Sequence, residues 1–184
     1  MNNLTSINVE VGNIVQCAYE AIVNSAHHSL LKGSGVCGAI HNAAGKELEK
    51  ECVEKYGSCE VGEAVITSAY ALPCKYVIHT VTPHYFDIYT KQKLSYETKI
   101  SLLSKCYISS LSLANQYELK SIAFPCLAMG KHGFPIDIGC KTAIKAIYHF
   151  LTMNKTSIEY IKIFCGNHIL ETILTSTIKG MNRH

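Results

Sequence analysis

Short apolar runs and longer amphipathic segments alternate along the chain, and this pattern predicts its secondary structure. The short runs are bounded by turn residues, which is typical of strands. They lie at residues 6–14, 21–24, 63–70, 75–81, 121–125 and 158–166. The longer segments repeat apolar residues about every three or four positions, which is typical of helices with one buried face. They lie at residues 36–55, 94–117, 135–153 and 168–178. Residues 84–93 have no periodic pattern and predict a loop.

The order of these elements, β-β-α-β-β-α-β-α-β-α, predicts the fold class. Strands that alternate with helices and are apolar on both faces favour a parallel sheet covered on both sides. We therefore expect an α/β protein built as a three-layer α-β-α sandwich, with a mixed but mostly parallel central sheet. In such sheets, ligands bind at the carboxyl ends of the strands, beside helix N-termini.

Length, charge and cysteine content narrow the class of protein. The 184 residues suit one domain, expected to span 1–184, and the formal net charge of +3 favours neither a membrane surface nor a specific nucleic-acid partner. No apolar stretch approaches the roughly 18 residues that cross a bilayer, and the N-terminus has no leader pattern. The nine cysteines include no C-x-x-C pair. We expect a cytoplasmic monomer with reduced thiols.

Two glycine-rich loops carry the candidate chemistry. Residues 33–38, GSGVCG, open directly into a predicted helix, and residues 126–134 follow a predicted strand and lead into another helix. Glycine lets backbone N–H groups approach an anion closely, and a helix N-terminus adds to the attraction. Two such loops at one sheet edge could hold two phosphates, which favours a ligand with a diphosphate.

GSGVCG also fits G-x-G-x-x-G, the dinucleotide-binding pattern, but its context does not. That pattern requires a strand ending at the first glycine and an acidic residue about 20 residues later, at the end of a second strand. Here eight residues separate Asn24 from Gly33, and the acids at the required distance, Glu51 and Glu54, lie in a helical segment. A nicotinamide dehydrogenase is therefore not expected.

Six segments together resemble the macrodomain family of ADP-ribose-binding modules. They are GNIV (12–15), AIVNSAH (21–27), GSGVCGAIHNAAG (33–45), CEVGEAVIT (59–67), VIHTVTP (77–83) and IAFPCLAMGKHGFP (122–135). The chain is most similar to the branch of small hydrolases that act on ADP-ribosylated proteins and O-acetyl-ADP-ribose.

This resemblance implies a role for each loop. The first loop would wrap one phosphate, and the second would wrap the other phosphate and the distal ribose. Asn13 would face the adenine with Ile14 beside it, and Asn24 would support the distal ribose. The implied ligand-binding residues are Asn13, Ile14, Asn24, Gly33, Gly35, Val36, Cys37, Gly38, Ala128, Met129, Gly130, Lys131 and His132. Lys131 would contact phosphate or remain a solvated loop lysine.

Three residues depart from the hydrolase pattern. His27 replaces an asparagine that orients the ribose, Cys37 replaces an aspartate, and His132 replaces an aromatic residue. They could be neutral replacements in an otherwise conventional pocket, which would require no cofactor. They could instead bind Zn²⁺ with a water as fourth ligand, or form a thiolate nucleophile with a histidine partner. The candidate catalytic residues are Asn24, His27 and Cys37.

Three further histidines are interpreted as structural or solvated. His28 and His41 flank the first loop, with His41 expected in the first turn of a helix, and His79 is expected to be a core imidazole bonded to backbone. Two functions remain open: hydrolysis of an ADP-ribosyl bond, and non-catalytic reading of ADP-ribose. Free ADP-ribose or ADP-ribosylated proteins would be the partners in either case.

Overall fold

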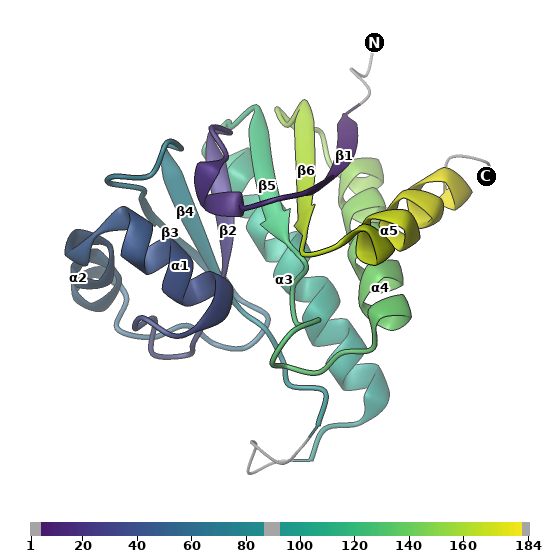
Figure 1. The fold of residues 1–184 in the computed structure, drawn as a ribbon, viewed down its shortest axis with the longest axis horizontal. Helices are drawn as coiled ribbons and strands as arrows, with labels where there is room; N and C mark the ends of the chain where they lie inside the picture. Colours follow the sequence, from purple (N-terminus) through teal and green to yellow (C-terminus); the bar gives the residue numbers. More distant parts are fainter. Residues whose placement is uncertain (1–4, 87–92, 182–184) are drawn as a thin grey trace.

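A computed structural model describes residues 5–86 and 93–181, and it contains a six-stranded mixed sheet. The strands are β1 (Ser6–Val11), β2 (Ala21–Ala26), β3 (Ala64–Ser68), β4 (Tyr76–Val81), β5 (Ser121–Pro125) and β6 (Tyr160–Cys165). Their spatial order is β1-β6-β5-β2-β4-β3, and every neighbouring pair is parallel except β3 with β4. The carboxyl ends of β2, β4, β5 and β6 therefore share one edge of the sheet (Figure 1).

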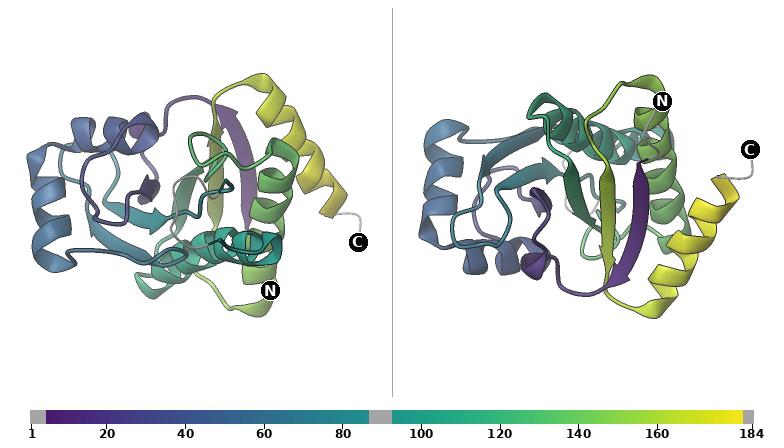
Figure 2. Two further views of the ribbon diagram at one scale, coloured as in Figure 1. Left: turned by 90° about the horizontal axis from the view of Figure 1, so that it is seen from below. Right: turned by 90° about the horizontal axis from the view of Figure 1, so that it is seen from above.

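Helices cover both faces of this sheet, which confirms the predicted α-β-α sandwich. They are the 3₁₀ turn η1 (Ile14–Gln16) and helices α1 (Gly35–Ala44), α2 (Lys46–Lys55), α3 (Tyr96–Gln116), α4 (Ile136–Met153) and α5 (His168–Met181). Helices α1 and α2 lie on one face and α3 and α4 on the other, with α5 beside α4 at the β1 edge (Figure 2). No helix in the described ranges is long and apolar enough to cross a membrane.

The two largest apolar clusters of the core lie on opposite faces of the sheet. The larger one packs α3 and α4 against the strands and includes the fully buried Tyr107 and Phe124. The smaller one lies under α1 and α2 and includes Ile22, Ile40 and Leu48. Every residue of β2 except Ser25 is buried, because helices cover both faces of this strand, and successive side chains point alternately to the two faces. This alternation directs Asn24 towards α1, as it does Ile22.

The helix predicted over 36–55 is in fact two helices. Gly45 has a φ of +96°, which interrupts the helical backbone, and its N–H bonds the carbonyl of His41 at the end of α1. The apolar stripe continues across the break, which is why periodicity alone predicted one helix. His41 accordingly lies in the last turn of α1 and not in the first turn of a helix.

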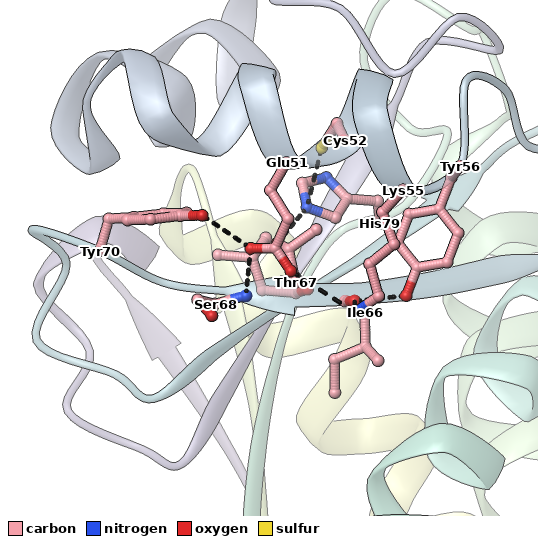
Figure 3. A network of polar contacts seen from close by, with 10 residues as sticks. Glu51, Cys52, Lys55, Tyr56, Ile66, Thr67, Ser68, Tyr70 and His79 are labelled. Atoms are coloured by element: carbon pink, nitrogen blue, oxygen red, sulfur yellow. Dashed lines mark hydrogen bonds and ion pairs between the residues drawn. The ribbon is translucent and has the colours of Figure 1, made fainter.

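Helix α2 is attached to β3 by side-chain bonds (Figure 3). Glu51 accepts bonds from the N–H of Ser68 and the hydroxyl of Tyr70, both at 2.9 Å. The Tyr56 hydroxyl donates to the carbonyl oxygen of Ile66 at 2.6 Å. These bonds hold α2 over the strand after the chain has turned at Gly45.

Some predicted boundaries are corrected by the structure. The strand predicted over 6–14 ends at Val11, because Asn13 caps η1, and the strand predicted over 21–24 continues to Ala26. Of the loop predicted over 84–93, residues 84–86 and 93 lie outside helices and strands. The rest falls outside the described residues.

Candidate functional site

The two glycine-rich loops meet at the carboxyl edge of the sheet and border a two-lobed cleft. The first loop connects β2 to α1, and the second connects β5 to α4. One lobe has a volume of about 360 Å³ and is lined by both loops, including His27, Cys37 and His132. The other lobe has a volume of about 410 Å³ and is lined by residues that follow β1 and β6, including Asn13 and Phe164.

Five residues line both lobes and therefore mark where they join. They are Gly35, Val36, Pro125, Cys126 and Gly130. All of them except Pro125 belong to the predicted phosphate loops, so a ligand filling both lobes must pass its middle part between these loops. A nucleotide joined to a second group through a diphosphate has this shape.

The backbone of the loops explains their glycines. Gly35 has a φ of +60°, a left-handed conformation that favours glycine at the start of α1. A Cβ added at Gly38 would lie 2.7 Å from the carbonyl oxygen of Gly33, so only glycine fits without moving the loop. In the second loop the non-glycine Ala128 has a φ of +62°. Backbone strain of this kind, at a residue other than glycine, is typical of functional loops.

Asn13 and Ile14 lie in the larger lobe, where the resemblance expects the adenine. The side-chain oxygen of Asn13 accepts the backbone N–H of Val15 at 3.2 Å, so it is already engaged in capping η1. Its amide nitrogen and the second lone pair of its oxygen can still bond a ligand. Phe164 gives this lobe an aromatic wall.

Asn24 lies beneath the cleft and lines neither lobe. Its side chain is fully buried, and its amide nitrogen is 3.6 Å from the sulfur of Cys37 and 3.1 Å from Nδ1 of His79. Asn24 therefore supports the first loop from below. Cys37 is 6% exposed and lies in the first turn of α1, on the wall of the smaller lobe.

His79 extends this polar layer across the sheet. Its Nε2 is 2.9 Å from the hydroxyl of Thr67 and 3.6 Å from the sulfur of Cys52 (Figure 3). Because the Asn24 amide nitrogen can only donate, Nδ1 of His79 accepts and Nε2 carries the proton. The predicted backbone partner is thus replaced by side chains. Burial and the nearby His41 imidazole lower the pKa of His79 to about 3.

His41 lies close to this layer. Its ring centroid is 6.1 Å from that of His79, and its side chain is 4% exposed. Neither of its ring nitrogens has a hydrogen-bond partner among the described residues. Burial lowers the pKa of His41, so its imidazole is neutral at pH 7.

The structure places His132 deeper in the smaller lobe than His27. His27 is exposed and its Nδ1 is 2.8 Å from the Ser29 hydroxyl. His132 has its Nδ1 2.6 Å from the Thr82 hydroxyl, and its ring stacks on His84 with centroids 3.8 Å apart. Burial, with a smaller contribution from His84, lowers the pKa of His132 to about 4. This imidazole is therefore neutral at pH 7.

Thr82 and His84 are site residues that the sequence reasoning missed. They fix the orientation of His132 from the carboxyl end of β4, next to the β2 loop. The signal available was their position directly after a predicted strand. Conversely, His28 is solvated and bonds the Cys59 carbonyl at 2.8 Å, away from the cleft.

The zinc and thiolate alternatives are not supported by this geometry. Within residues 5–86 and 93–181, no group of three or more histidine, cysteine, aspartate or glutamate side chains is close enough to hold a metal ion. His27, Cys37 and His132 therefore do not form a zinc site. The Cys37 sulfur contacts Asn24 and the Leu31 carbonyl, and no imidazole of the described residues bonds it.

The fold and cleft define an α/β sandwich of the nucleotide-binding kind, and comparisons with known proteins identify the family. The Macro domain model matches residues 23–143, which is more than half of the chain. O-acetyl-ADP-ribose deacetylase 2 of Pantoea vagans is 39% identical over 168 residues, covering 90% of this chain and 92% of that protein. The chain belongs to the macrodomain family.

Two other comparisons agree with this assignment. ADP-ribose glycohydrolase MACROD2 of Xenopus laevis is 44% identical over 154 residues, which cover 84% of this chain but only 35% of that longer protein. The solved structure of a mutant Oceanobacillus iheyensis macrodomain with ADPR has a TM-score of 0.88 at 33% identity. It covers 100% of this chain and 97% of that one.

Proposed function

We propose that this macrodomain binds ADP-ribose and hydrolyses ADP-ribosyl derivatives, either a mono-ADP-ribosylated protein or O-acetyl-ADP-ribose. The observation that carries the proposal is the two-lobed cleft joined at two glycine-rich loops. Its larger lobe offers an aromatic wall for adenine, and its smaller lobe offers polar side chains for the distal ribose. The relatives named for ADP-ribose chemistry support the same ligand.

The loops would supply most of the binding and stabilisation. Gly35, Val36 and Gly130 lie at the junction, and their backbone N–H groups would bind the diphosphate there. In the smaller lobe, His132 would hydrogen-bond the distal ribose as a neutral imidazole held by Thr82. Preorganised donors of this kind stabilise charge that develops during attack by water.

Catalysis would use water and no metal. His27 and Cys37 lie on the walls of the smaller lobe, so both are positioned to contact the distal ribose or the water beside it. Asn24 would act by supporting Cys37 from below. Family members named as hydrolases support turnover, and the replacement of aspartate by Cys37 predicts that it is slow.

Calorimetric titration of the purified protein with ADP-ribose tests the binding. At 100 times its Kd the ligand should raise the free energy of unfolding by about 2.7 kcal/mol. A Gly38→Ala variant should bind more weakly, because its new Cβ would meet the Gly33 carbonyl. Gly180→Ala, near the end of α5 with open space around it, is the matched control. The absence of both heat and thermal shift would refute the proposal.

The second candidate is a reader that binds ADP-ribose without cleaving it. Cys37 favours this reading, because its thiol contacts Asn24 and the Leu31 carbonyl and bonds no imidazole or carboxylate of residues 5–86 and 93–181. Incubation with an ADP-ribosylated acidic protein and with O-acetyl-ADP-ribose separates the two functions. Release of free ADP-ribose supports the enzyme, and tight binding without release supports the reader.

The remaining predictions concern the protein in its cell. We propose a monomer that acts in the cytoplasm on ADP-ribose or ADP-ribosylated proteins, without a specific nucleic-acid partner. The modest net charge of +3 supports the proposal that the protein has no specific nucleic-acid partner. Sedimentation of the purified chain tests the oligomeric state.

A further inference from the structure

A hydrogen bond joins the two phosphate loops across the cleft. The Nζ of Lys131, in the second loop, donates to the hydroxyl oxygen of Ser34, in the first loop, at 2.6 Å. The two residues are 97 positions apart in the sequence. Each is adjacent to a junction residue, Ser34 to Gly35 and Lys131 to Gly130, and both line the smaller lobe.

The charge of Lys131 is not neutralised in this position. Among the described residues that line the two lobes, it is the one lysine, arginine, aspartate or glutamate. Its hydrogen-bond partner is a neutral hydroxyl, and both side chains are exposed. A cation beside the junction and facing no acid can interact favourably with an anion that enters the cleft.

We propose that Lys131 selects ligands that carry a diphosphate, and that Ser34 holds its ammonium group over the cleft until a phosphate oxygen takes it. The proposal rests on the proposed ADP-ribose binding and adds a residue that determines specificity. Exchange of a neutral acceptor for a phosphate replaces one hydrogen bond by a stronger, charge-assisted one. The ammonium remains protonated throughout, and no covalent bond changes.

The two partners should therefore have opposite effects on affinity. Removing the ammonium of Lys131 loses the contact with phosphate. Removing the hydroxyl of Ser34 leaves the contact between Lys131 and phosphate intact. It also removes the Lys131–Ser34 hydrogen bond, which must otherwise break before that contact forms. The effects of the two substitutions on affinity should not be additive, because in the absence of Lys131 the Ser34 hydroxyl no longer competes with phosphate for its ammonium group.

The test is calorimetric titration of the full chain with ADP-ribose, inorganic pyrophosphate and adenosine, each at low and high salt. Lys131→Met should weaken ADP-ribose and pyrophosphate binding about tenfold at low salt and less at high salt, with adenosine unchanged. Ser34→Ala should strengthen diphosphate binding by up to about threefold. The double variant should bind like Lys131→Met. Lys32→Met, which removes an exposed charge from the same loop outside the cleft, should bind like the wild type.

Several outcomes overturn the inference. Lys131→Met with wild-type affinity shows that the ammonium makes no phosphate contact, and equal weakening of adenosine shows a packing role. Weaker diphosphate binding by Ser34→Ala shows that the hydroxyl is not a competitor. Pyrophosphate separates the two proposals. If it binds through Lys131 while ADP-ribose does not bind, the proposed function fails and the inference stands. If no diphosphate binds, both fail.

Discussion

His79 provides a quantitative prediction about stability and pH. Its imidazole is fully buried between Asn24 and Thr67, and its pKa is lowered from 6.5 to about 3. The folded protein therefore keeps His79 neutral at pH values where the unfolded chain protonates it. A lowered histidine pKa means that stability is fully present above the unfolded value of 6.5 and is lost as pH falls towards 3.

The size of the effect follows from the two pKa values. Between pH 7 and pH 5, one such histidine lowers the free energy of unfolding by about 2 kcal/mol. His41 and His132, whose pKa values are also lowered, act in the same direction. Between pH 7 and pH 5, the free energy of unfolding of the wild type should therefore fall by more than His79 alone accounts for.

Urea unfolding at pH 7 and pH 5 measures this loss. A His79→Asn variant should be less stable at pH 7, because Thr67 loses its bonded partner, yet it should lose about 2 kcal/mol less between the two pH values. His149→Gln, which removes an exposed histidine from α4, should retain the wild-type pH dependence.

An equal loss in His79→Asn and the wild type would refute the reasoning. Where the variant does not fold, NMR titration of the wild-type imidazoles decides the matter. The His79 signals should show no protonation above pH 5 in the folded protein. A titration midpoint near 6.5 would show that burial does not lower the pKa of His79.

Three further predictions concern the loops and helices. A His27→Asn, Cys37→Asp double variant introduces the residues that the hydrolase pattern has at these positions. We expect its turnover of O-acetyl-ADP-ribose to rise about tenfold or more in a steady-state assay. Unchanged turnover would show that His27 and Cys37 do not limit catalysis. Gly38→Ala should lower the melting temperature by a few degrees, because the new Cβ would force the first loop to move away from the Gly33 carbonyl. Scanning calorimetry measures the melting temperature, and an unchanged value would refute the packing argument. Gly45→Ala should lower the free energy of unfolding, measured in urea, by about 1 kcal/mol, because Gly45 has a φ of +96°. A stabilised variant would show that the break between α1 and α2 is not required.

The layout of the site was predictable where it depends on local backbone preference. Gly33, Gly35 and Gly38 indicated a loop with close backbone contacts, and their position before an amphipathic helix placed the loop at a helix N-terminus. Both features are present. The split at Gly45 was less predictable, because the apolar stripe of α1 and α2 continues through it.

Side-chain partners were not predictable from the chain alone. Asn24 and His79 face each other because β2 pairs with β4 in the register Asn24↔His79. The pattern of apolar residues predicts two buried strands but not their register. The resemblance implies that Asn24 supports the distal ribose, and the structure adds that its buried side chain lies beneath the first loop, beside Cys37.

The sequence by itself determined the sandwich, the mostly parallel sheet, the two glycine-rich loops and the resemblance to macrodomains, because these depend on burial patterns and backbone preferences within short segments. Only the tertiary structure decided that the loops enclose a two-lobed cleft, that His27, Cys37 and His132 form no metal site, and that Lys131 reaches Ser34. Those features depend on contacts between residues as far as 97 positions apart. Such contacts are fixed by strand register and loop closure.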